Sequence, residues 1–119
     1  MKPYVRKLTG GLYDGWGYFT VPKKIINYIT SKDRWVTYWL DKNYNLIISR
    51  EPKVKDVNGI FLQKRYYYAT SGSVQFRIPH EIFDVWNSLF PETEFKYVKI
   101  VVLQNNNLQV TLQKERTVA

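Results

Sequence analysis

The sequence predicts a mostly β protein with two short helices, in which two similar halves of one chain form one compact domain. First, "WGYFTVPKKIINYI" at 16–29 and "SVQFRIPHEIFDVW" at 73–86 both read as a short strand, a proline and a helix. Second, two apolar strands with a polar turn between them follow each stretch. Third, 45% of the 119 residues are hydrophobic, which is enough for one core, whereas a unit of about 55 residues is marginal alone.

An internal duplication explains why each signal occurs twice. An offset of 57 residues aligns Phe19 with Phe76 and Pro22 with Pro79. After a five-residue insertion, an offset of 62 aligns a second group of pairs: Val36 with Val98, Asn43 with Asn105, Asn45 with Asn107 and Leu46 with Leu108. We expect a first repeat over 1–50, a surface linker over 51–59, a second repeat over 60–113 and a disordered tail over 114–119.

The first elements of each half follow from local patterns. An opening strand is expected in "PYVRKL" at 3–8 and in "IFLQKRYYYA" at 60–69, and the glycine-rich "TGGLYDGWG" at 9–17 reads as a flexible loop. In "GYFTV" and "VQFRI", apolar and polar residues alternate, as in a strand that is buried on one face. Proline ends each strand and suits the first turn of a helix, here expected to be about ten residues long.

A β-hairpin is expected after each helix. The apolar runs "RWVTYWL" and "LIISR" flank the polar "DKNYN", and "KYVKIVVL" and "LQVTLQ" flank "QNNN". Asn and Asp tolerate positive φ and form hydrogen bonds to nearby backbone, so these polar clusters predict turns.

This order of strand, proline, helix and hairpin resembles the swapped-hairpin DNA-binding family of the AbrB and MazE type. The segments "YFTVPKKIINYI" and "QFRIPHEIFDVW" look like its apolar strand and helix, and "VRKL" at 5–8 is similar to its basic opening strand. The resemblance implies a swapped-hairpin-like β-barrel, a pseudo-dimer within one chain, which binds DNA through the opening strand and the adjoining loop. Tyr18 and Gln75 stand where the family often has arginine.

The charge balance indicates a polyanionic partner. Eighteen Lys and Arg against ten Asp and Glu give a formal charge of +8, of which residues 1–59 carry +6 and residues 60–119 carry +2. Such a surface attracts nucleic acid and releases counterions on binding it. The alternative is that the excess lysine only aids solubility.

Candidates for DNA contact lie first on the two opening strands. The resemblance implies Arg6 and Lys7 in the first half and Lys64 and Arg65 in the second, and Lys2 lies beside the first strand. The run "KRYYYA" also combines cations with aromatics, a composition suited to stacking bases. Tyrosines on opposite faces of one strand cannot all stack, so at least one face of this strand is expected to belong to the core.

Three further basic residues are candidates on physical grounds. Lys23 and Lys24 occupy the first turn of a predicted helix, where N–H groups already favour anions, although both also read as ordinary solvated lysines. Arg77 projects from the polar face of its strand and either contacts guanine or phosphate or pairs with Glu81 or another carboxylate.

The residue inventory argues against an enzyme, a metal site or a cofactor. There is no cysteine, and the single histidine, His80, is followed by Asp84 where a paired-histidine zinc motif would have its second histidine. We expect no metal, no cofactor and no catalysis. No apolar run reaches the roughly 18 residues of a membrane span, so we expect no membrane partner and a cytoplasmic protein, in the host cytoplasm if it is viral.

The leading hypothesis is a small transcriptional regulator that binds double-stranded DNA through a basic β surface, either alone or as a homodimer. One alternative is a protein-binding module, similar to an antitoxin or an inhibitor, with exposed aromatic residues as anchors. Another is a single-stranded nucleic-acid binder that uses "KRYYYA". The abundance of Lys, Asn, Ile and Tyr is typical of an AT-rich genome, such as that of a virus or plasmid.

Overall fold

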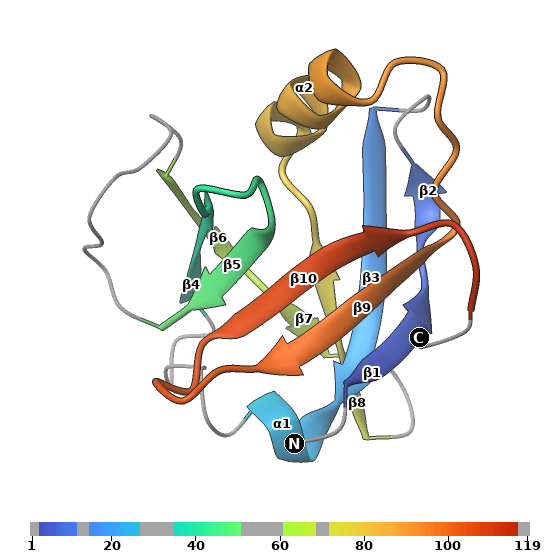
Figure 1. The fold of residues 1–119 in the computed structure, drawn as a ribbon. Coiled ribbons are helices and arrows are strands. Elements are labelled where there is room, and N and C mark those ends of the chain that lie inside the picture. Colours follow the sequence, from blue (N-terminus) through green and yellow to red (C-terminus); the bar gives the residue numbers. More distant parts are fainter. Residues whose placement is uncertain (1–2, 12–14, 27–34, 51–60, 69–71, 117–119) are drawn as a thin grey trace.

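Two antiparallel sheets and two short helices make up the described part of the chain (Figure 1). The computed structural model describes residues 3–11, 15–26, 35–50, 61–68 and 72–116. The six-stranded sheet has the order β1 (Tyr4–Lys7), β9 (Tyr97–Val102), β10 (Leu108–Gln113), β5 (Leu46–Ser49), β4 (Trp35–Leu40) and β6 (Phe61–Arg65). The four-stranded sheet has the order β2 (Thr9–Gly11), β3 (Trp16–Pro22), β8 (Ser73–Arg77) and β7 (Tyr67–Tyr68). The helices are α1 (Lys23–Ile26) and α2 (His80–Leu89).

The strand pairings join the two halves of the chain. The central pair of the four-stranded sheet, β3 and β8, places Phe19 opposite Phe76. In the six-stranded sheet, β5 pairs with β10 and Ile47 lies opposite Gln109. The opening strand β1 pairs with β9, in the second half, and β6 pairs with β4, in the first. Each opening strand therefore adds to the hairpin of the other half.

At two corners a single residue separates a strand of one sheet from a strand of the other. Only Leu8 separates β1 from β2, and only Tyr66 separates β6 from β7. Both residues are buried, so each corner is fixed by an apolar side chain that packs in the core. The predicted closed barrel is wrong for the described residues: β1 and β6 remain the two edges of an open sheet. The physical reason is that each opening strand turns into the second sheet instead of pairing with the other opening strand.

Most predicted elements have counterparts with similar bounds. The hairpin strands, β3, β8 and α2 lie where the alternation and the prolines indicated, and α2 is ten residues long. The stretch at 9–17 differs from the predicted loop, because Thr9–Gly11 form β2 and pair with β3. Gly10 has a φ of 82°, which favours glycine, and it lies opposite Gly17. The linker at 51–59, most of the first predicted helix and residues 117–119 lie outside the described residues.

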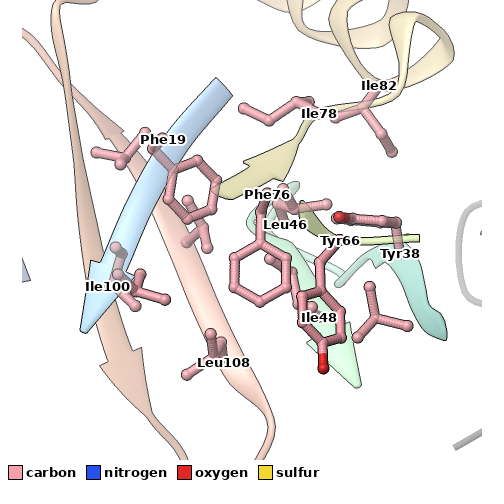
Figure 2. Close-up of a cluster of buried hydrophobic side chains, with 14 of the residues drawn as sticks. Phe19, Tyr38, Leu46, Ile48, Tyr66, Phe76, Ile78, Ile82, Ile100 and Leu108 are labelled. Atoms are coloured by element: carbon pink, nitrogen blue, oxygen red, sulfur yellow. The ribbon is translucent and has the colours of Figure 1, made fainter. Parts of the chain in front are cut away.

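The core lies between the two sheets and is closed at one end by α2. Figure 2 shows Phe19 and Phe76 among Leu46, Ile100 and Leu108, all of which are buried. The rings of Phe19 and Phe76 lie 5.9 Å apart between centroids, and Tyr66 packs 5.8 Å from Phe76. From α2, the side chains of Ile82, Phe83 and Trp86 point into the same cluster. The alternation of β3 and β8 thus buries one face and leaves the other for solvent.

None of the described helices has the length and hydropathy of a membrane-spanning segment.

Candidate nucleic-acid interface

The strands around the two corners carry basic residues and no acidic ones. The described residues of β1, β2, β3, α1, β6, β7 and β8 include seven Lys or Arg and no Asp or Glu. By contrast, α2 contains Glu81 and Asp84 and no Lys or Arg. Figure 1 shows α1, with Lys23 and Lys24, and α2, with Glu81 and Asp84, at opposite ends of β3, whereas Arg77 ends β8 close to α2.

We call the positively charged surface the basic face. It consists of the outward side chains of β3 and β8 and the cations of the two opening strands: Arg6, Lys7, Tyr18, Thr20, Lys64, Arg65, Gln75 and Arg77. On β3 and β8 these side chains alternate with the buried Phe19, Val21, Val74 and Phe76.

The first corner contains a hollow of about 300 Å³ between β1 and β3. Three basic residues line it, namely Arg6, Lys7 and Arg116, together with Tyr18 and Tyr97. Thr9, Thr20, Val5 and Phe19 complete the lining, and none of the lining residues is acidic. Three like charges around one hollow repel each other, and a bound anion would relieve that repulsion. Phosphate oxygens also accept hydrogen bonds from the N–H groups of arginine and lysine and from the tyrosine hydroxyl group.

A second hollow, of about 210 Å³, shares Tyr18 with the first. Trp16, Tyr18 and Arg77 line it with Gly17 and Ile78. Arg77 is exposed, as the polar-face prediction required, and its Nε donates to Oε1 of Gln75 at 3.2 Å. Pairing of Arg77 with Glu81 or another carboxylate stays a prediction; Oε1 of Glu81 lies 2.8 Å from Nδ1 of His80.

The cations of the second opening strand lie far from those of the first. β1 and β6 are the two edges of the six-stranded sheet, and the strands that continue them, β2 and β7, are the two edges of the four-stranded sheet. Lys64 and Arg65 are both exposed, and the Arg65 guanidinium lies 5.1 Å from the ring centroid of Trp35. The structure therefore brings Arg6 and Lys7 together and places Lys64 and Arg65 at the opposite corner.

The structure describes some of the remaining candidate residues, and others lie outside the described ranges. Lys23 and Lys24 are exposed on α1, which follows β3 directly, and neither lines the hollows described above. The rest of the predicted first helix lies outside the described residues, so the anion site at its N-terminus stays a prediction. Lys2 lies outside the described residues. Of the aromatic run at 64–69, Tyr66 is a core residue, as expected for one face of that strand.

Sequence reasoning missed several residues of the first corner. Arg116 was assigned to a disordered tail, yet residues 114–116 are described and Arg116 lines the larger hollow. Trp16 and Tyr18 share the outward face of β3. The alternation of buried and outward residues around Phe19 could have predicted this position for both. No local signal places Tyr97 or Arg116 beside β1, because that contact depends on how distant strands pair.

Within the described ranges, no three His, Cys, Asp or Glu side chains gather closely enough to bind a metal ion. Comparisons of the chain with protein-family profiles, with curated protein sequences and with solved structures gave no match.

Proposed function

We propose that this protein binds double-stranded DNA through the basic face and acts as a transcriptional regulator. The observation that carries the proposal is the separation of charge: seven cations and no carboxylate occupy the described strands of the two corners and α1. The hollow lined by Arg6, Lys7 and Arg116 supports it, because that hollow offers donors for a phosphate group. Phosphate contacts of this kind give affinity and orientation, and base contacts give sequence preference.

The pair β3 and β8 is the part of the basic face suited to a DNA groove. The major groove is about 12 Å wide and admits a two-stranded β-ribbon. The neighbours of this pair, β2 and β7, have only three and two residues, so the central ribbon is the longest part of its sheet. Gln75 and Arg77 project outward from β8, and these residue types make bidentate contacts with adenine and guanine. In this arrangement the cations of the opening strands contact flanking phosphates.

The same proposal includes an internal duplication. In the sequence, an offset of 57 aligns β3 with β8, and an offset of 62 aligns the hairpin β4–β5 with β9–β10. An offset of 58 aligns Arg6 with Lys64 and Lys7 with Arg65. The pairs Phe19–Phe76 and Ile47–Gln109, which lie opposite one another, are then equivalent residues, as expected around a twofold axis. Because each opening strand pairs with the other half's hairpin, the arrangement supports a swapped-hairpin pseudo-dimer and the resemblance to the AbrB and MazE type.

The two corners are not equivalent as ligand sites. Offsets of 62 and 57 place Trp35 at the position of Tyr97 and Gln75 at the position of Tyr18. At the second corner the Arg65 guanidinium already covers the Trp35 ring. We therefore assign the tighter phosphate contact to the first corner, with Arg6 and Lys7.

A salt titration of DNA binding tests the proposal. Fluorescence anisotropy with a labelled duplex should give affinity that falls linearly with the logarithm of salt concentration, with a slope of about −0.9 per phosphate contact. The double variant Arg6→Ala/Lys7→Ala should bind more weakly and lose about two units of that slope. Lys42→Ala/Arg50→Ala is the matched control, because it also removes one Lys and one Arg, both exposed and outside the basic face.

Two results would contradict the proposal. Affinity for DNA that does not change with salt would remove its electrostatic basis. Equal losses in the control variant and in Arg6→Ala/Lys7→Ala would mean that net charge, and not the basic face, causes binding.

A protein partner is the second candidate function, and a different end of the molecule favours it. Tyr44, Leu89 and Phe90 are exposed near α2, where a hollow of about 170 Å³ is lined in part by Tyr44, Trp86 and Phe90. Exposed aromatic side chains beside a hollow are typical anchors of protein interfaces. On this account, Tyr44→Ser/Phe90→Ser leaves DNA affinity unchanged, and an effect on DNA affinity would place these residues in the DNA interface instead.

A further inference from the structure

Trp16 is an exposed aromatic residue that the duplex-binding proposal does not use. Its exposed fraction of 55% is the largest among the exposed large hydrophobic residues of the described chain. The side chain lies at the start of β3, on the outward face, and lines the hollow of about 210 Å³ with Tyr18 and Arg77. More than half of this residue's surface is exposed, so the side chain contributes little to the hydrophobic stabilisation of the fold. Core packing therefore does not explain why a tryptophan occupies this position.

The indole ring packs against the backbone of the neighbouring strand. Gly10 pairs with Gly17 beside it and has a φ of 82°. A Cβ atom added at Gly10 would lie 3.0 Å from Cε3 of Trp16 and 2.3 Å from its carbonyl oxygen. The ring therefore packs against bare glycine backbone, and any side chain at this position would displace it. A ring that is already positioned loses little conformational entropy when a ligand stacks on it.

The residues around Trp16 offer the groups that bind a nucleobase. The indole offers a face for stacking, Arg77 offers N–H donors for the acceptors on a base edge, and no carboxylate lines the hollow. Tyr18 also lines the hollow that is lined by Arg6, Lys7 and Arg116, so the two hollows share one residue. Base and phosphate are joined within a single nucleotide, which can occupy both hollows.

We propose that the hollow beside Trp16 binds one unpaired nucleobase, at a duplex end or junction, while its phosphate binds between Arg6, Lys7 and Arg116. This inference rests on the proposed function and adds a structural preference to it. The site occurs once per chain, because an offset of 57 places Ser73 at the position of Trp16 and the second half lacks the ring.

The test compares two duplexes with the same number of phosphates. One is blunt, and the other has its last base pairs replaced by short tails of unpaired thymidines on both strands, so that each strand keeps its length. Wild-type protein should bind the tailed duplex at least about fivefold more tightly, since each stacked base contributes a factor of this size or larger. Trp16→Ala should lower the affinity for the tailed duplex to that for the blunt one, and Trp16→Phe should keep part of the preference. Trp35→Ala is the matched control and should keep the full preference, because Arg65 already covers that ring.

A fluorescence measurement distinguishes stacking from a structural effect of these substitutions. Tailed DNA should quench tryptophan emission in wild type and in Trp35→Phe, and should not do so in Trp16→Phe. Equal wild-type affinity for both duplexes would overturn the inference and leave duplex binding intact. A loss in Trp16→Ala that is the same for both duplexes would also overturn it. Absence of binding to either duplex would instead remove the proposed function.

Discussion

Phe19 and Phe76 occupy the point where the two halves of the chain meet. They lie opposite one another on β3 and β8, both are fully buried, and their ring centroids are 5.9 Å apart. The neighbouring outward residues, Tyr18 and Gln75, belong to the basic face. One residue pair therefore holds the core together, and the residues next to it in the chain face the proposed ligand.

Truncation of the core pair should destabilise the protein strongly. Phe19→Ala or Phe76→Ala removes a buried ring and leaves a cavity, so the free energy of unfolding should fall by about 3–5 kcal/mol. Urea denaturation followed by circular dichroism measures the change. Gln104→Ala, in the exposed turn before β10, is the control and should change stability by less than about 0.5 kcal/mol. A loss below about 1 kcal/mol for Phe19→Ala would contradict the described packing.

Arg77 should contribute sequence preference as well as affinity. If it contacts a guanine edge, Arg77→Ala weakens binding to the preferred duplex by about 1–3 kcal/mol and reduces discrimination at one base position. A binding-site selection experiment with both proteins measures this. A loss that is uniform over all sequences would show that Arg77 contacts phosphate and does not read a base.

At the scale of elements, β3 connects the core, α2 and the basic face. Its first residues pack under α2, where Ile78 N–H donates to the Gly17 carbonyl oxygen at 3.0 Å. A Cβ atom at Gly17 would lie 2.9 Å from Cζ of Phe83 and 2.9 Å from the Thr9 carbonyl oxygen. Glycine at this position therefore allows helix α2 and strand β2 to approach β3 closely.

Gly17→Ala should destabilise the protein through crowding. The added methyl group must displace the Phe83 ring or the β2 backbone, which should lower the free energy of unfolding by about 1–3 kcal/mol. Thermal unfolding measures the loss. A second substitution, Phe83→Leu, should make the penalty of Gly17→Ala smaller than it is in wild type, since the crowding ring is gone. Additive effects of the two substitutions would argue against this contact.

The elements were largely predictable from sequence because their signals are local. Alternation, the prolines at 22 and 79 and the polar turns lie within a few residues of the elements they define. The open sheets and strand β2 were not predictable, since they depend on pairings between distant segments. Arg6 and Lys7 could be named as candidates from a local pattern. Their shared hollow with Arg116 and Tyr97 could not be predicted, because it depends on the pairing of distant strands.

At the scale of the whole molecule, the two halves exchange strands. β1 adds to the second hairpin through β9, and β6 adds to the first hairpin through β4. The central pairs, β3 with β8 and β5 with β10, also cross between halves. Neither half can complete a sheet alone, and the basic face exists only when both are present.

Separated halves should therefore not fold alone. Residues 1–59 and 60–119, produced as two polypeptides, should each lack a cooperative unfolding transition, because an isolated unit of about 60 residues without its partner strands leaves apolar faces exposed. Mixing them at equal concentration should restore the β signal in circular dichroism and the binding of DNA. A stably folded first half on its own would contradict the exchange of strands.

The most direct test of the central claim is a nuclear magnetic resonance titration of isotope-labelled protein with a short duplex. The proposed interface predicts that the largest amide shift changes cluster on β1, β3, β6 and β8. Smaller changes are expected on α2 and on the turn at 41–45, which contacts α2 through the hydrogen bond from Trp86 Nε1 to the Tyr44 carbonyl oxygen. Arg6→Ala/Lys7→Ala should reduce the changes on β1 and β3. Saturable shifts confined to α2 and the turn at 41–45, with β3 and β8 unaffected, would contradict the account.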